Sequence, residues 1–153
     1  MKEYFSRICT YLILLKMKRT TSMKKLILSL EAIYYILLGG IIYYFIEILF
    51  RGYSHYSMFL CGGIIFYCIS LFHRRYDSLH LITKMIMCSF IITVIELTFG
   101  IIFNIWLKQG VWNYTDQYFH FKGQICLTFS ILWFFLSLPA LYLEKKIRLF
   151  FHS

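Results

Sequence analysis

The sequence predicts an all-α membrane protein, a bundle of about four transmembrane helices preceded by a short N-terminal interfacial helix. Hydrophobic residues make up 60% of the 153 residues and charged residues only 15%, whereas about a quarter of a typical soluble domain is charged. Several uncharged apolar stretches also approach the roughly 20 residues that a helix needs to cross about 30 Å of hydrocarbon. Only one proline, Pro139, is present to interrupt long helices.

The predicted transmembrane domain covers residues 26–143. Its spans are expected at 26–50, 54–72, 84–107 and 124–143, and residues 144–153 are then a basic cytoplasmic tail. The basic segment 1–25 contains an apolar stretch, Ile8 to Leu15, that is too short to span. We expect this segment to form the interfacial helix. The alternative is that translation begins at Met17 or Met23.

The distribution of lysine and arginine predicts the orientation. Thirteen of the 16 lie in the N-terminal segment, the joint after the second span and the C-terminal tail, and three, Arg51, Lys108 and Lys122, lie in the other loops. The positive-inside rule therefore predicts a multi-pass protein of the cell membrane with both termini in the cytoplasm. The basic clusters are expected to contact anionic lipid headgroups. No nucleic-acid motif accompanies the net charge of +9, so nucleic acid is not an expected partner.

Polar residues within or beside the spans are the candidate functional residues, because an intramembrane charge is costly and usually faces a bundle interior or a cavity. Glu47 and Arg51 are one helical turn apart and can pair, with His55 following one turn later. Glu96 and Asn104 lie on one stripe of the third span, with Gly100 between them as a notch for close packing. We predict that Glu47, Arg51, His55, Glu96 and Asn104 form a small polar cavity. The alternative is that they only join helices by hydrogen bonds.

Small residues predict where the helices pack closely. Gly39-Gly40 and Gly62-Gly63 give the first two spans sites of close approach. Ser89 and Thr93 extend the polar stripe of the third span, and a weakly polar face follows Gly123, Cys126, Ser130, Trp133 and Ser137 in the fourth.

The segment from Lys108 to Gly123 is rich in aromatic residues: Trp112, Tyr114, Tyr118, Phe119 and Phe121. Such residues commonly form a belt at the membrane interface. Because Gly110 and Gly123 bracket the segment, a lid-like excursion is the alternative.

The sequence contains no defensible active site, cofactor motif or metal site. There is no phosphate-binding loop, HExxH or GxSxG string, and the five cysteines and five histidines show no metal-ligand spacing. An intramembrane enzyme built from Glu47, His55, Glu96 and Asp116 is a remaining alternative, but these residues alone define no reaction.

Several strings occur together in a distinctive order. They are YYFIE before Arg51, the RGYSHYSM string that begins there, Gly62-Gly63, Glu96-Leu97, VWNY from Val111 and GQICL from Gly123. In these strings the sequence resembles a family of small bacterial membrane proteins described as "Putative ABC-transporter type IV", or CmpB-like. The resemblance extends from about Tyr34 to Tyr142. The matched motif residues are Glu47, Arg51, Ser54, His55, Glu96, Asn104, Trp112, Tyr114, Gly123 and Cys126. Asn113 stands where an aspartate commonly follows the tryptophan.

The resemblance implies a permease-like subunit in the cytoplasmic membrane, with no catalytic residues to transfer. An ABC role would need a separate ATPase subunit, and a homo-oligomer would raise the helix count. The leading prediction is therefore a transporter-like subunit with a polar cavity beneath the outer-loop motif of Trp112, Tyr114, Asp116, Gly123 and Cys126. The alternatives are a non-transport structural or partner-binding membrane protein and the intramembrane enzyme.

Overall fold

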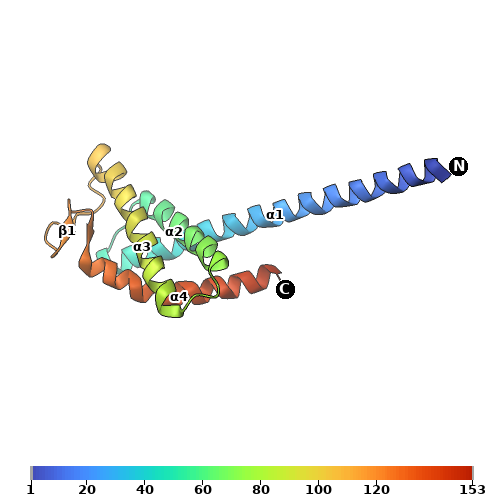
Figure 1. The fold of residues 1–153 in the computed structure, drawn as a ribbon. Helices are drawn as coiled ribbons and strands as arrows, with labels where there is room; N and C mark the ends of the chain where they lie inside the picture. The colour runs from blue at the N-terminus through green and yellow to red at the C-terminus, as the bar shows by residue number, and fades with distance from the viewer. Residues whose placement is uncertain (1, 153) are drawn as a thin grey trace. The chain divides into compact units, whose positions relative to one another are not determined.

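The computed structural model describes the backbone of residues 2–152, and side chains from Met23 onward except those of residues 24, 25, 27 and 152. Its elements, in chain order, are α1 (Lys2–Arg51), α2 (Tyr56–Arg75), α3 (Leu81–Phe99), the π-helix η1 (Gly100–Trp106), β1 (His120–Phe121), β2 (Ile125–Cys126) and α4 (Leu127–His152) (Figure 1). In the described part of the chain, four helices are long and apolar enough to cross a membrane, at 28–51, 56–75, 81–106 and 127–151. The predicted all-α, four-span class is confirmed.

The chain divides into two compact units, Met1–Tyr34 and Tyr35–Ser153. The first unit is the N-terminal part of α1. The predicted interfacial helix falls within it, but the side chains of residues 1–22 lie outside the described residues. All sites discussed below belong to the second unit.

The spans begin and end at local signals. His55 lies in an extended conformation before α2, and its Nδ1 accepts a hydrogen bond from the Ser57 amide, which caps the helix. At the other end of the bundle, α4 continues through the residues that the sequence analysis assigned to a tail. The third span ends in a wide π-helical turn, where the Leu107 amide donates to the Ile102 carbonyl. This turn contains Asn104, which the loop that follows uses as an anchor.

Glycine allows α1 and α2 to pack with their backbones in contact, as the glycine pairs predicted. A Cβ added at Gly62 would lie 2.1 Å from the Tyr43 Cβ and 2.9 Å from the Gly39 carbonyl oxygen. A Cβ added at Gly63 would lie 2.6 Å from the Ile36 carbonyl oxygen. Lipid tails are as apolar as the side chains, so contact at this distance, rather than apolar burial, holds such helices together.

Hydroxyl groups join α3 to α4. Ser89 donates to the Ser130 carbonyl at 2.7 Å, and the Thr93 and Ser130 hydroxyls lie 3.3 Å apart. The predicted polar stripe of the third span therefore meets the weakly polar face of the fourth, and interhelical hydrogen bonding there is confirmed.

An ionic cluster joins α2, α3 and α4 where the α2–α3 turn meets the end of α4. Glu144, fully buried on α4, pairs with His73 of α2 and with Arg148, whose Nε lies 3.5 Å from Glu144 Oε1. Asp77 in the turn lies 3.4 Å from both Lys84 Nζ and Arg148 Nη2. These contacts fix the ends of three helices to one another.

Asp77 gives the cluster a pH dependence. Two opposing effects act on the pKa of Asp77. Partial removal from water favours a higher pKa, but the hydrogen bonds and positive charges of Arg148 and Lys84 have the larger effect, so the pKa lies below its ordinary value. The stabilisation is therefore complete above about pH 4 to 5, the range in which an unfolded carboxyl ionises, and is lost as the pH falls through the lower folded-state pKa. We expect Asp77→Asn to lower the free energy of unfolding in detergent by up to about 1 kcal/mol at neutral pH, because the side chain is 57% exposed and solvent screens its charge. The difference between the two proteins should shrink in acid, and a difference that grows there would contradict the ion pairing.

Candidate functional site

The carboxylate of Glu96 joins three elements in the bundle interior. Its side chain is 1% exposed, so the prediction that it faces inward is confirmed. Oε2 accepts a hydrogen bond from Trp133 Nε1 of α4 at 2.9 Å, and Oε1 accepts from the hydroxyls of Tyr43 of α1 at 3.4 Å and Tyr114 of the loop at 3.3 Å. The rings of Tyr43 and Trp133 also stack, with centroids 5.6 Å apart. We call Glu96 with these three donors the Glu96 cluster.

Burial and the neighbouring Glu96 raise the pKa of Tyr114 well above its ordinary value, because both oppose a phenolate. Tyr114 therefore remains a neutral hydroxyl that donates to the acid. The loop between η1 and β1, residues 107–119, is in this way attached to the buried carboxylate of Glu96.

Arg51 attaches the end of α1 to the same loop. Its Nη1 lies 2.7 Å from Glu47 Oε2, the helical pair that the spacing predicted. Its Nη2 donates to the Val111 carbonyl at 2.5 Å and to the Tyr53 hydroxyl at 3.2 Å. The guanidinium thus binds a carboxylate and a loop carbonyl together, a geometry that its planar fork of donors favours.

Asn104 and Gln124 hold the loop against the π-helical turn. Asn104 Nδ2 donates to the Trp112 carbonyl at 3.0 Å and to Gln124 Oε1 at 2.8 Å, and its Oδ1 accepts from the Val111 amide at 2.6 Å. The notch at Gly100 receives the side chain of Gln124, whose Oε1 would lie 2.6 Å from an added Cβ. The notch predicted for packing against another helix is therefore filled by a loop residue.

The side chains of the other predicted residues make none of the hydrogen bonds just described for Glu96, Arg51 and Asn104, although the Gly123 carbonyl accepts from the Tyr114 amide at 2.8 Å. His55 caps α2, where its Nδ1 also lies 2.8 Å from the Ser57 hydroxyl, and Asp116 is exposed in the loop. Gly123, at φ +69°, turns the chain where an added Cβ would meet Asn113 Oδ1 at 2.6 Å, and Cys126 is a buried free thiol in β2. Within the described residues, no three His, Cys, Asp or Glu side chains gather as a metal site would require.

Replacing Asn104 with alanine is expected to loosen the loop between η1 and β1 without unfolding the spans, because it removes three hydrogen bonds from one side chain. Hydrogen exchange followed by mass spectrometry should show faster exchange at Val111 and through 107–126, with α3 and α4 unchanged. The matched control is Asp116→Ala, an exposed residue of the same loop. Equal exchange in wild type and Asn104→Ala would contradict the anchoring role.

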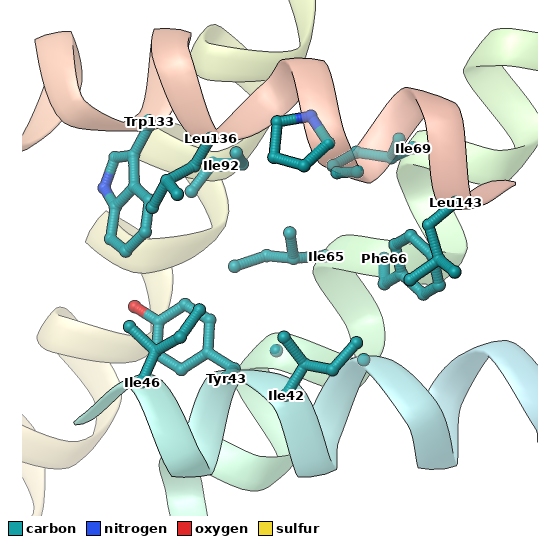
Figure 2. A pocket seen from close by; sticks show the side chains of 14 residues that line it. Ile42, Tyr43, Ile46, Ile65, Phe66, Ile69, Ile92, Trp133, Leu136 and Leu143 are labelled. Carbon is teal, nitrogen blue, oxygen red and sulfur yellow. The ribbon is translucent and has the colours of Figure 1, made fainter. Parts of the chain in front are cut away.

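A cavity of about 360 Å³ lies between α1, α2 and α4. In Figure 2, Tyr43 and Ile46 of α1 face Trp133 and Leu136 of α4, with Ile65 of α2 between the two helices. The complete lining is Gly39, Ile42, Tyr43, Ile46, Gly62, Ile65, Phe66, Ile69, Ile92, Trp133, Leu136, Pro139, Ala140 and Leu143. None of the five residues predicted for a polar cavity lines this cavity. Their polar atoms form hydrogen bonds within the protein.

Sequence reasoning missed three residues of these sites. Gln124 was predicted only as the first residue of a span, although it belongs to the GQICL string that begins at Gly123. Glu144 and His73 were placed in a tail and a hydrophilic joint. The one-turn spacing of Glu144 and Arg148 was the available signal for a helical ion pair.

A bundle of four apolar helices with a hydrogen-bonded polar core defines a multi-pass integral membrane protein. Residues 42–150 match the family described as "Putative ABC-transporter type IV". The match covers more than half of the chain, which therefore belongs to this family, as the resemblance predicted. Among curated proteins and among solved structures, none matches the chain significantly.

Proposed function

We propose that this chain is the permease-like membrane subunit of a transporter and that a separate ATPase subunit binds it. The observation that carries the proposal is the family match over residues 42–150 of a four-span bundle. Since the sequence has no phosphate-binding loop, another chain would supply ATP hydrolysis.

The ATPase would bind the end of the bundle that carries the α2–α3 turn. The positive-inside rule favours a cytoplasmic location for this end, together with both termini. Arg75, Lys145 and Lys146 are exposed there and suit an acidic surface of a partner or anionic headgroups. Because Glu144 pairs with Arg74 of α2, and Asp77 pairs with Lys84 of α3 and Arg148 of α4, a force applied at the turn would reach three helices.

The second candidate is a partner-binding or structural membrane protein that transports nothing. It is favoured by the bonding of Glu47, Glu96 and Asn104 to other protein groups, since residues that bind a polar substrate usually leave donors or acceptors free. In this case the polar residues serve only to hold the helices and the loop together.

Gentle extraction from the native membrane separates the two candidates. The tagged chain should co-purify with ATPase activity if the transporter proposal holds. Ser78→Trp adds bulk to the exposed α2–α3 turn and should abolish the co-purified activity, whereas Gln117→Trp places the same indole side chain on the exposed loop at the other end and should preserve it. Both changes are neutral and leave the orientation signal intact. A folded wild-type chain without ATPase activity would overturn the transporter proposal and favour the second candidate.

A further inference from the structure

The chemistry of the cavity between α1, α2 and α4 restricts what it can hold. Of the residues that line it, Tyr43 and Trp133 carry the polar side-chain atoms, and both donate to Glu96. A polar ligand would therefore meet hydrocarbon on nearly every side. Water is excluded for the same reason, because a buried water needs two to four polar partners. The occupant must be apolar.

The depth of the cavity within the spans indicates which apolar molecules surround it. Its lining positions are 39–46 of the span 28–51, 62–69 of 56–75, 92 of 81–106 and 133–143 of 127–151. All lie well inside the spans, at the depth where the surrounding medium is acyl chains. The cavity is also partly open rather than sealed.

Contacts between α1 and α4 frame this cavity. Near the loop end the rings of Tyr43 and Trp133 stack, and further along the Tyr35 hydroxyl donates to the Glu144 carbonyl at 3.4 Å. Between these contacts, the lining of α1 and α4 includes Gly39 and Ala140, whose side chains are no larger than a methyl group, beside larger apolar side chains such as Ile42. Because the protein leaves this volume unfilled and the cavity is partly open, it can admit an acyl chain.

The dimensions of the cavity favour a single acyl chain, rather than a protein helix, as its occupant. The lining extends over roughly 10–15 Å at 1.5 Å per residue, so 360 Å³ corresponds to a cross-section of about 25–35 Å². A helix of 10–12 Å diameter would need roughly 80–110 Å². The volume also falls within the range of about 300–1,000 Å³ that is usual for small ligands. A helix from a second copy would not fit without moving α1 away from α4.

We propose that this cavity binds one acyl chain of a phospholipid, which enters from the bilayer between α1 and α4. The site is independent of the proposed function, because it requires only the membrane and not an ATPase. The chain would lie against the Tyr43–Trp133 pair, next to the Glu96 cluster. Occupancy would then support the contacts that attach the outer loop to Glu96.

Brominated lipid tests the proposal directly, because bromine quenches indole fluorescence at contact range. Trp133 is only 6% exposed, so a chain outside the bundle does not reach it, whereas a chain in the cavity does. The full chain carrying Trp106→Phe, which removes the tryptophan with 73% exposure, is reconstituted in vesicles of phosphatidylcholine brominated at mid-chain. We expect strong quenching relative to unbrominated vesicles. Trp112, in the loop outside the spans, contributes an unquenched background.

A matched pair of substitutions on α4 assigns the quenching to the cavity. Leu136→Phe adds bulk to the lining and should abolish the quenching, whereas Leu138→Phe, at an exposed position two residues away, should leave it unchanged. Absence of quenching in the folded Trp106→Phe protein would overturn the proposal, even if Leu136→Phe failed to fold. Quenching that persists in folded Leu136→Phe would also overturn it, as would a dimer that excludes lipid from the cavity.

Discussion

Replacing Glu96 with leucine is expected to lower the free energy of unfolding by about 2–5 kcal/mol. Among the residues that the structure describes, Glu96 is the acceptor for the Trp133 indole N–H and for the hydroxyls of Tyr43 and Tyr114, and the change removes it. A hydrogen bond between membrane helices contributes about 0.6 kcal/mol on average, but a buried donor left without an acceptor costs about 1–3 kcal/mol. Chemical unfolding in detergent, followed by the fluorescence of folded protein, measures the loss.

The conservative replacement separates the hydrogen bonds from the charge. In Glu96→Gln, the amide oxygen can accept from Trp133, and the tyrosine hydroxyls can accept from the amide NH₂ because a hydroxyl both donates and accepts. We therefore expect a much smaller loss than in Glu96→Leu. If glutamine is as damaging as leucine, the carboxylate charge itself is required and the cluster is more than a structural joint.

A double-mutant cycle tests the contact with Trp133. Glu96→Leu combined with Trp133→Phe removes a donor along with its acceptor, so the combined loss should be smaller than the sum of the single losses. Strict additivity would show that the 2.9 Å contact between Glu96 and Trp133 contributes nothing to stability.

The sequence was sufficient to predict the helices and the small-residue contacts, because both depend on local composition. Spans follow from length and apolarity, and Gly62-Gly63 predicted close approach before any partner was known. The pairing of Glu47 with Arg51 was predictable for the same reason, since one turn of a helix fixes its geometry.

The partners of Glu96 were not predictable, because they come from three segments distant in the sequence. Tyr43 is 53 residues away and Trp133 is 37 residues away. A polar stripe on one helix is compatible with a water-filled cavity or with a set of hydrogen bonds, and only the positions of the other helices decide between them. The buried contact of Glu144 with His73 was missed as well, because His73 is 71 residues away and Glu144 is a single acid in a basic flanking sequence.

Replacing Gly62 with alanine is expected to disrupt the packing of α1 on α2. The added Cβ would lie 2.1 Å from the Cβ of Tyr43, far closer than real Cβ atoms come, and 2.9 Å from a backbone carbonyl, so rotating a side chain cannot relieve it. Overpacking usually costs about 1–3 kcal/mol, and we expect a loss at or above the top of that range because two backbones must separate. Size-exclusion profiles and unfolding curves in detergent measure the effect.

The matched control is Ile64→Ala on the exposed face of the same helix. It changes side-chain volume without touching α1, and removing apolar surface from contact with lipid costs little because the medium is as apolar as the side chain. A mild effect of Gly62→Ala, comparable to that of Ile64→Ala, would mean that α1 and α2 do not approach as closely as the backbone contacts indicate. If Gly62→Ala alone lowers the stability strongly, the environment of Trp133 should change as well. Tyr43 would move with α1, away from Glu96 and Trp133, so the emission of Trp133 should change along with the loss of stability.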